Sequence, residues 1–506
     1  MTIKKGLLKP TIQITLLSFV GIIFSFLSQL VIAYYFGITT ERDAYFAAIV
    51  VPTYLGTIFT GSIGFVFLPQ IIELRNNNFK ESNKLINTVL VSTTLVLLIL
   101  IFLGIYFSES ILRVTALGFD DEKIIYTQKL FRILLLSSLF LVLTNLVSYL
   151  YQIKQRFIRP ALAPLIIVPI SILFVVTLNS EIGIMSLALG SLVGSVISLL
   201  IVLPILFTKE FSFNLRINML DENFISIIKI SIPLFLGGIL FRSAPVFERM
   251  IASGLPPGSI SILGYSGQLI TTLATVATSG IIISFFPSMS DSWTKDINLF
   301  NQYLNKGIRS ILILTIPIAF SFILFGDTFV EIIFQRGAFT QKDTLAVSET
   351  FSLMTPAFIM LCLGGITSKI YYISKRTLDL TIISSFELLS YFLLSYFLSQ
   401  YFGYKGIAIG TSIAYSVFML VYFFYATFFI IRDYNYKLIV FDVLKITSIA
   451  IFSFGICYLS FIVIENYINK YSSIAFSLLI AFILYLQLLF KFKNTELISL
   501  IKKIKK

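Results

Sequence analysis

Long apolar runs separated by short polar stretches fill this chain from one end to the other. A helix needs about 20 mostly apolar residues to cross the hydrocarbon core of a bilayer. Fourteen runs reach that length, and none shows the strand alternation of a transmembrane barrel. The pattern therefore predicts an all-α polytopic membrane protein with 14 transmembrane helices. The runs cover residues 11–36, 44–72, 86–107, 130–152, 160–178, 182–208, 226–252, 260–287, 307–325, 348–372, 378–401, 405–431, 443–464 and 472–490.

The first twelve runs contain a sequence repeat with an offset of about 218–220 residues. Residues 67–69 (FLP) correspond to residues 285–287 (FFP), and residues 151–156 (YQIKQR) correspond to residues 371–376 (YYISKR). Six spans separate equivalent positions, so both halves cross the membrane in the same direction. Such parallel repeats are related by an axis along the membrane normal, and substrate is expected to bind between the halves.

The repeat divides the chain into three parts. Two six-helix lobes are expected at residues 1–215 and 216–435. The last two spans have no counterpart in the repeat, and with a basic tail they form an appendix at residues 436–506. The tail could lie on the anionic inner leaflet or be a solvated terminus.

Composition excludes several classes of protein. The 506 residues are 57% hydrophobic and 12% charged, with a mean hydropathy of +0.94, which leaves too little polar surface for a soluble protein of this length. The basic residues behind the net charge of +13 are dispersed among the loops, which argues against a nucleic-acid partner. The chain has no histidine and both cysteines lie in predicted spans, so neither a disulfide framework nor a histidine-based metal site or proton relay is expected.

The basic residues instead predict the orientation in the membrane. With the N-terminus inside, the inner loops and tails carry 27 Lys and Arg residues against nine at the outer side. Because positive charge concentrates on the cytoplasmic side, both termini are expected in the cytoplasm. The first run is too long for a cleavable signal peptide, so we expect the first span to remain in the protein.

Three charged residues lie inside the seventh run. Arg242, Glu248 and Arg249 each cost roughly 2.5–3.5 kcal/mol near the centre of a span unless a partner, an aqueous cavity or a substrate compensates. Arg242 and Arg249 are seven residues apart and share a helix face, whereas Glu248 is expected to point elsewhere. Two guanidinium groups on one face would suit a diphosphate. The alternatives are an ion pair of Arg242 with Glu387 and extension of Arg249 to the outer interface.

Other polar residues within spans are candidates for coupling or binding. Glu248 and Glu387 could each be discharged by a proton or Na⁺, or could form a charge pair with a neighbouring span. Gln29 and Asn145 could simply bond across helices. The outer loops contain no nucleophile with a base, no phosphate-cradling loop and no convincing acid cluster, so we expect a transporter rather than an enzyme, without a metal or cofactor.

Several motifs resemble those of one family, the MurJ/MviN-type lipid II flippases. Residues 247–270 (FERMIASGLPPGSISILGYSGQLI) are similar to the family's signature between the seventh and eighth spans. Residues 332–344 (IIFQRGAFTQKDT) resemble its F-x-RG-x-F segment, and residues 34–48 (YYFGITTERDAYFAA) resemble its FG and DAF turn. The segments RVTALGF, LFRILL and QRFIRPALAP also occur in the family's order, so the resemblance covers the first twelve spans.

The resemblance implies a fold and a function. The family belongs to the multidrug/oligosaccharidyl-lipid/polysaccharide exporter superfamily, whose members have two six-helix lobes around a central cavity. It implies that an undecaprenyl-diphosphate-linked saccharide, a lipid II-like peptidoglycan precursor, is moved from the inner to the outer leaflet of the bacterial inner membrane by alternating access. The driving force would be a Na⁺ or H⁺ gradient or the membrane potential, the partners would be the lipid-linked substrate and membrane lipids, and we expect a monomer.

The chain departs from the family in its charges. Residues 18–29 and 54–64 lack the arginines of the family's first two spans, and Gln268 stands where an arginine follows the tyrosine of the eighth span. Arg242 and Arg249 are expected to provide this charge from another helix, with Gln268 and Gln29 as further substrate contacts. Glu248 occupies the position of the family's acidic residue, which favours a role in coupling.

Three alternative functions stay open at this point. The cargo could be an O-antigen, capsular or exopolysaccharide lipid-linked unit. A multidrug exporter would carry amphipathic cations, for which a cavity with a deep arginine is poorly suited. An inactive membrane scaffold for envelope synthesis would tolerate substitution of Arg242 and Glu248.

Overall fold

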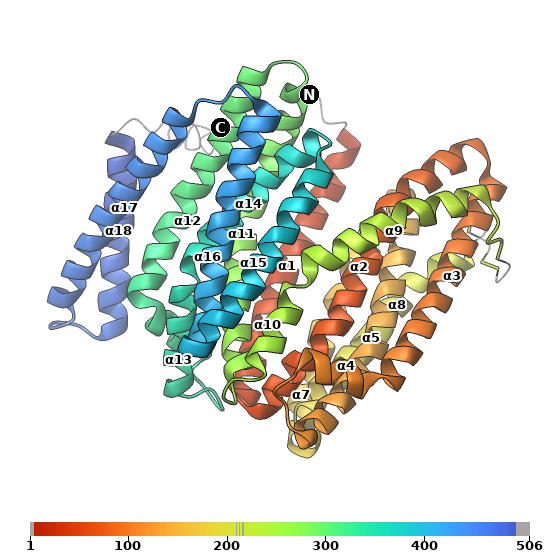
Figure 1. Ribbon diagram of the computed structural model, residues 1–506, viewed down its shortest axis with the longest axis horizontal. Coiled ribbons are helices and arrows are strands. Elements are labelled where there is room, and N and C mark those ends of the chain that lie inside the picture. The colour runs from red at the N-terminus through yellow and green to blue at the C-terminus, as the bar shows by residue number, and fades with distance from the viewer. Residues whose placement is uncertain (1–4, 209, 212, 215–216, 492–506) are drawn as a thin grey trace. The chain divides into compact units, whose positions relative to one another are not determined.

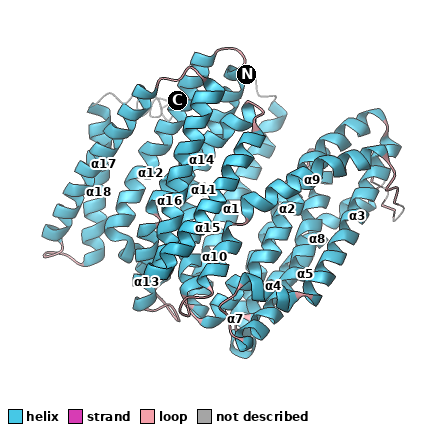
Figure 2. Cartoon of the chain, viewed as in Figure 1, coloured by secondary structure: helices cyan, strands magenta, loops and turns pink. Residues whose placement is uncertain are grey.

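The structure is a computed structural model that describes residues 5–208, 210–211, 213–214 and 217–491. Within these residues every regular element is a helix, and loops join the helices without any strand (Figure 2). Over the same residues, 14 segments are helical, long and apolar enough to cross a membrane. The predicted fold class is therefore confirmed.

The chain forms two compact units. Unit 1 comprises Met1–Ser261 and Phe334–Thr340, and unit 2 comprises Ile262–Ile333 and Gln341–Lys506. The division at residues 1–215, 216–435 and 436–506, which follows from the sequence repeat, stays a prediction.

The helices of unit 1 are α1 (Lys5–Phe36), α2 (Thr40–Asn77), α3 (Phe79–Tyr106), α4 (Ser108–Thr115), α5 (Asp121–Ile153), α6 (Ile158–Leu162), α7 (Ile167–Ile182), α8 (Met185–Val202), α9 (Glu222–Arg242) and α10 (Ala244–Ala252), with the 3₁₀ turns η1 (Pro164–Ile166) and η2 (Leu203–Phe207).

Helix α5 lies at the centre of unit 1, where it packs against α2, α3 and α8, while α9 packs along α2 (Figure 1). Phe67 of α2 and Phe131 of α5 are completely buried in this core. Asn78 and Asp120 cap α3 and α5, because each side chain accepts a hydrogen bond from the backbone N–H three residues later. These caps fix where the long helices of unit 1 begin.

Small residues bring neighbouring helices close together in both units. A Cβ atom added at Gly190 of α8 would lie 2.7 Å from the Cα atom of Ser171 in α7. In unit 2, a Cβ atom at Gly410 would lie 2.9 Å from the backbone N of Ser395. Gly190 lies in residues 186–196 (SLALGSLVGSV) and Gly410 in residues 406–417 (GIAIGTSIAYSV), which correspond in the sequence repeat. Close approach at small residues is typical of membrane helix pairs. Equivalent glycines in the two repeats therefore allow the same close approach between neighbouring helices.

The seventh run forms two helices rather than the single one predicted for residues 226–252. The helix breaks at Ser243, between α9 and α10, and Pro245 follows in the first turn of α10. Proline has no backbone N–H to continue the helical ladder. The hydroxyl groups of Tyr54 and Ser243 each donate to the carbonyl of Ile239, both at 2.5 Å, so side chains satisfy the backbone beside the break.

Unit 2 contains most of α11 (Ser259–Trp293), α12 (Ile297–Phe334) up to Ile333, and all of the helices that follow α12. Phe325 has a φ angle of −131° inside α12, and its repeat equivalent Phe107 separates α3 from α4, so both halves break at this position. The helices are α11 (Ser259–Trp293), α12 (Ile297–Phe334), α13 (Gln341–Leu353), α14 (Thr355–Ile373), α15 (Thr377–Phe402), α16 (Tyr404–Tyr425), α17 (Tyr436–Ile464) and α18 (Lys470–Lys491), with the π-helix η3 (Ala426–Ile431).

The last two helices, α17 and α18, which the sequence predicts as an appendix, contact α12 along their length. Arg309 of α12 forms an ion pair with Asp442 of α17. Further along α12, Glu331 and Asp327 lie 3.2 and 3.6 Å from the ammonium group of Lys470 in α18. Apolar side chains fill the space between these ion pairs, including Phe320, Phe325, Phe454, Phe461 and Phe482. The hairpin of α17 and α18 is therefore part of the packed body of unit 2.

Asp442→Ala is expected to destabilise unit 2 far more than Asp327→Ala. Asp442 and Arg309 are both more than four-fifths buried, and removing one partner of a buried pair costs up to about 3–5 kcal/mol. Asp327 is half-exposed and an exposed pair contributes about 0–1 kcal/mol. Thermal unfolding of both variants in the same detergent micelles would measure the difference. Equal losses of thermal stability in the two variants would contradict a stabilising role of the ion pair between Arg309 and Asp442.

Candidate functional site

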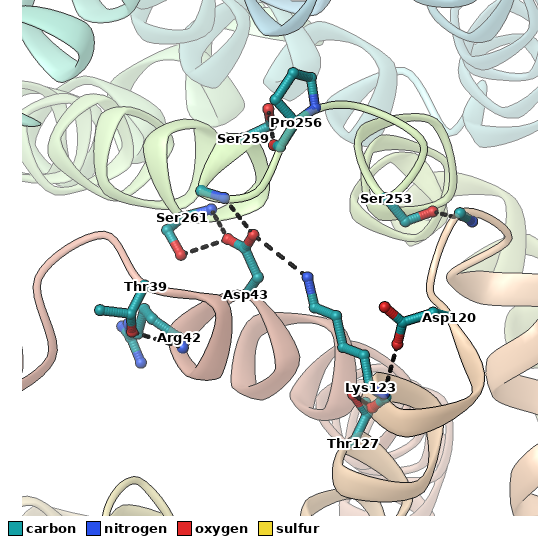
Figure 3. A network of polar contacts seen from close by, with 12 residues as sticks. Thr39, Arg42, Asp43, Asp120, Lys123, Thr127, Ser253, Pro256, Ser259 and Ser261 are labelled. Atoms are coloured by element: carbon teal, nitrogen blue, oxygen red, sulfur yellow. Dashed lines mark hydrogen bonds and ion pairs between the residues drawn. The ribbon is translucent and has the colours of Figure 1, made fainter.

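A buried carboxylate, Asp43, joins α2 to the start of α11. Its Oδ2 atom accepts a hydrogen bond from the N–H of Gly258 at 2.6 Å, and its Oδ1 atom accepts from the N–H and the hydroxyl of Ser261 at 2.8 and 2.6 Å (Figure 3). The ammonium group of Lys123 lies 3.7 Å from Oδ2. Asp43 is only 2% exposed. A buried charge is tolerated when it is paired and hydrogen-bonded, and these contacts meet both conditions.

Asp43 acts as an N-terminal cap of α11, although it belongs to another helix, α2. The first N–H groups of a helix have no partner within the helix, and the positive end of the helix dipole favours a nearby carboxylate. Here the carboxylate comes from α2, and it bonds the N–H groups of Gly258 and Ser261 on either side of the helix start at Ser259. The position of α11 at this end is thus set by a charge on another helix.

Lys123 connects the same carboxylate to α5. It lies in the first turn of α5, where Asp120 accepts a hydrogen bond from its backbone N–H at 2.8 Å. Its ammonium group lies 3.9 Å from the centre of the Phe119 ring, in a cation–π contact. Figure 3 shows the lysine side chain reaching from α5 toward Asp43. Three helices therefore meet at one ion pair.

Backbone contacts between turns surround this network. The N–H of Gly118 donates to the hydroxyl of Ser253 at 3.1 Å, and a Cβ atom at Gly118 would lie 2.3 Å from the Cα atom of Gly254. The N–H of Ala338 donates to the carbonyl of Tyr34 at 2.8 Å. We call residues 34–43, 118–123, 253–261 and 334–340 the turn cluster. Its turns approach so closely that separating them must break backbone packing as well as side-chain bonds.

Arg249 lies beside the turn cluster, in α10, and is 9% exposed. It forms an ion pair with Glu248, since neighbouring opposite charges satisfy each other where little water reaches. The helix face expected to be shared by Arg242 and Arg249, with Glu248 elsewhere, stays a prediction. The guanidinium carbon atoms of Arg249 and Arg42 lie 5.3 and 3.9 Å from the centre of one ring, Phe46. The Nε atom of Arg249 is buried and has no hydrogen-bond partner in the structure.

The other predicted substrate contacts are separated along the chain. Arg242 is the last residue of α9, and its side chain lies outside the described residues. Gln268 is exposed on α11, with its amide nitrogen 3.5 Å from the hydroxyl of Thr272. Gln29 of α1 is half-buried, and its side-chain oxygen is buried without a hydrogen-bond partner. Their roles stay predictions.

Glu387, the second candidate for ion coupling, belongs to a hydroxyl network in unit 2. The hydroxyl of Tyr422 in α16 donates to its carboxylate at 2.7 Å and lies 2.6 Å from the hydroxyl of Ser384. Tyr371 of α14 donates to the backbone carbonyl of Tyr422 at 2.7 Å. The network holds the carboxylate between three helices. The coupling roles of Glu387 and Glu248 stay predictions.

Sequence reasoning missed Asp43, Lys123 and Arg42 as site residues. In the sequence, Asp43 lies only within the family-like turn of residues 34–48, and Lys123 and Arg42 are among the nine basic residues expected at the outer side. A signal was present, because Asp43 and Ser261 are 218 residues apart, which is the offset of the sequence repeat. Repeats related by an axis meet each other at equivalent positions near that axis. The repeat alone could therefore have pointed to this contact.

The fold defines the chain as a polytopic α-helical membrane protein. A solved structure of "Lipid II flippase MurJ, inward closed conformation" has a TM-score of 0.82 at 24% identity and covers 96% of this chain and 99% of that one. An inward-facing multidrug resistance MATE family transporter of the MOP superfamily has a TM-score of 0.70 at 14% identity, with coverage of 80% and 93%. Both similarities concern the fold.

The sequence assigns the family. The family model "Lipid II flippase MurJ" matches residues 32–479, so the chain belongs to the MurJ lipid II flippase family, as its motifs predicted. A "Probable lipid II flippase MurJ" of Buchnera aphidicola subsp. Acyrthosiphon pisum is 28% identical over 424 residues, which are 81% of each chain. The "Lipid II flippase MurJ" of Thermosipho africanus is 26% identical, covering 85% of this chain and 88% of that one. Members of this family are transporters rather than enzymes.

Proposed function

We propose that this chain moves lipid II, an undecaprenyl-diphosphate-linked peptidoglycan precursor, from the inner to the outer leaflet of the bacterial cytoplasmic membrane. The observation that carries the proposal is the family match over residues 32–479, which spans all but the ends of the chain. The fold supports it, since parallel-repeat membrane transporters work by alternating access. The protein acts as a monomer and without a cofactor in this proposal.

The proposed orientation follows from the distribution of basic residues. Inner loops and tails carry 27 Lys and Arg residues against nine at the outer side, so both termini are cytoplasmic. The turn between α1 and α2 then faces outward, and so does the whole turn cluster. In this orientation Asp43 and its partners seal the outer end of unit 1, and releasing cargo outward requires the bonds to Gly258 and Ser261 to break.

The diphosphate and saccharide of the cargo require polar contacts along their path. Arg249 and Arg242 are the proposed diphosphate contacts, because guanidinium groups bind phosphate oxygens through paired donors. The buried, unbonded Nε atom of Arg249 supports a further acceptor at this position. Gln268 and Gln29 are proposed as hydrogen-bonding contacts with the saccharide.

The proposed driving force is a Na⁺ or H⁺ gradient or the membrane potential. Glu248 and Glu387 are the proposed coupling residues. Both are bonded carboxylates within spans, and both can change charge when a proton or a cation binds. Neutralisation of the Glu248 carboxylate would weaken its ion pair with Arg249 and make Arg249 available to the cargo. This links the coupling residue directly to a substrate contact.

Rescue of bacteria depleted of their own lipid II flippase tests the proposed function. The wild-type chain is expected to restore growth. Arg249→Ala is expected to reduce colony formation by roughly 10–100-fold, since losing a hydrogen bond to a charged group costs about 1.5–3 kcal/mol. Arg113→Ala is the matched control, because Arg113 is half-exposed in α4 and pairs with Glu109 and Asp121.

Membrane levels of each variant must be equal for the comparison to count. Failure of the wild-type chain to rescue growth, at good expression, would contradict lipid II as the cargo. Full rescue by Arg249→Ala would remove Arg249 from the proposed substrate path and leave the proposed cargo intact.

A further inference from the structure

Two basic side chains contact one carboxylate at the end of unit 1 where α2 and α5 finish, and the charge of a third, Arg156, also acts on it. Glu210 lies in the connector between α8 and α9. Its Oε2 atom is 2.8 Å from the ammonium group of Lys154 and 3.6 Å from the guanidinium group of Arg75. The hydrogen bond from Lys154, and then the charges of Lys154, Arg75 and Arg156, hold the pKa of Glu210 below its ordinary value. Glu210 is therefore ionised at neutral pH, and its charge is lost only as the pH falls through that lowered pKa.

Arg75 and Lys154 are built into the fold, whereas Glu210 and Arg156 are exposed. The side chains of Arg75 and Lys154 are 14% and 13% exposed, but that of Glu210 is 55% exposed. The Phe211 ring, which is completely buried, lies 4.4 Å from the guanidinium carbon of Arg75 and 5.1 Å from the ammonium group of Lys154. The ring of Phe79 lies 4.6 Å from the same guanidinium carbon. These cation–π contacts fix the positions of the two basic groups independently of Glu210.

The cluster also has unused binding capacity. The Nη1 atom of Arg75 is buried and has no hydrogen-bond partner in the structure. Three cations face one carboxylate, which offers two oxygen atoms and a single negative charge. A phosphate or diphosphate group offers more oxygen atoms and more charge, and it can accept paired hydrogen bonds from arginine. Because the side chain of Glu210 is 55% exposed, water can hydrate its carboxylate when a ligand takes its place.

We propose that Arg75, Lys154 and Arg156 form a binding site for a phosphate or diphosphate group, and that Glu210 occupies this site when no ligand is bound. With both termini cytoplasmic, the site faces the inner leaflet, at the height where a lipid headgroup lies. The assignment of the ligand to the diphosphate of the lipid-linked cargo rests on the proposed function. The phosphate of an anionic membrane lipid offers the same chemistry and is the competing source.

Diphosphate binding to the purified full-length protein tests this site. The probe is farnesyl diphosphate in uncharged detergent micelles, with farnesol as the uncharged control, and affinity is measured by titration calorimetry. Glu210→Gln removes the competing charge and is expected to tighten binding of farnesyl diphosphate by at least about five-fold. Arg75→Gln combined with Lys154→Gln is expected to weaken it by at least about ten-fold. Arg113→Gln, at the opposite end of unit 1, is the matched control and should bind like wild type.

The tightening by Glu210→Gln is the decisive result, because misfolding cannot produce a gain of affinity. Equal affinities for wild type, Glu210→Gln and the double variant would overturn the proposal. In a second arm, phosphatidylglycerol replaces the diphosphate probe. If only phosphatidylglycerol binding depends on these variants, the phosphate site stands and its assignment to the cargo is overturned.

The proposed function can fail without this inference failing. Rescue of flippase-depleted bacteria by the wild-type chain, together with equal affinities for all variants, would overturn the phosphate site alone. Absence of rescue, together with variant-dependent diphosphate binding, would overturn lipid II as cargo and leave the phosphate site in place.

Discussion

Asp43→Asn is expected to abolish rescue of flippase-depleted bacteria while leaving the protein in the membrane. The amide oxygen of asparagine can still accept from Ser261, but its NH₂ group would face the N–H of Gly258 and the ammonium group of Lys123. Donors would then face donors, and a buried cation would lose its counter-charge. Breaking a buried pair in this way costs about 3–5 kcal/mol, which shifts an equilibrium between closed and open turn clusters by more than about 100-fold toward the open form.

The state of the turn cluster can be measured separately from growth. Ser253→Cys places a thiol where the hydroxyl now bonds the N–H of Gly118, and membrane-impermeant maleimide should label it faster in the Asp43→Asn background. Glu41→Gln is the matched control, since Glu41 is an exposed carboxylate in the same first turn of α2. Unchanged labelling and growth in Asp43→Asn would show that this carboxylate does not hold the turn cluster closed.

Gly37→Ala is expected to destabilise the protein more than Gly403→Ala, although both glycines have positive φ angles. Gly37 has a φ angle of +49°, which costs an L-residue about 1–2 kcal/mol. Its new Cβ atom would also lie 2.4 Å from the carbonyl oxygen of Ala338. Backbone atoms cannot rotate out of the way as a side chain can, so the turn must move, at a further cost of about 1–3 kcal/mol.

The structure provides a control that isolates the second effect. Gly403 has a φ angle of +58°, and a Cβ atom added there would meet nothing within 4 Å. Gly403→Ala therefore measures the cost of the backbone conformation alone. Thermal unfolding of the two variants in detergent micelles should show a larger loss for Gly37→Ala, accompanied by faster labelling at Ser253→Cys. Equal losses would mean that the contact between Gly37 and Ala338 carries no stability.

Much of the fold follows from hydropathy and the internal repeat. Fourteen apolar runs predict fourteen spans because the thickness of the bilayer sets the length of each helix. Hydropathy alone does not register the break at Ser243, which lies beside Pro245 and where the hydroxyl groups of Tyr54 and Ser243 bond the carbonyl of Ile239. The ion pair between Arg309 and Asp442 is not predictable from the sequence, because the two residues are 133 positions apart and only the fold brings them together.

The candidate site was harder to predict, because the sequence was searched for charged residues whose burial inside a span costs free energy. That search favours charges deep in spans, such as Arg242, and overlooks Asp43 at a helix start, where a charge is ordinarily exposed. In the structure Asp43 is buried because turns distant in sequence cover it, with close approach allowed by glycines such as Gly118 and Gly258. Sequence spacing shows the glycines but not which turns they bring together.

The bond between Asp43 and Ser261 has a consequence for the origin of the fold. These residues hold equivalent positions in the two repeats. A symmetric dimer of identical six-helix subunits would bring the same residue type to this contact from both subunits. Two carboxylates at hydrogen-bonding distance cannot both stay ionised, and two serines would leave Lys123 without a counter-ion. The present pairing of an acid with a hydroxyl requires two copies with different sequences, and two repeats within one chain can differ in this way.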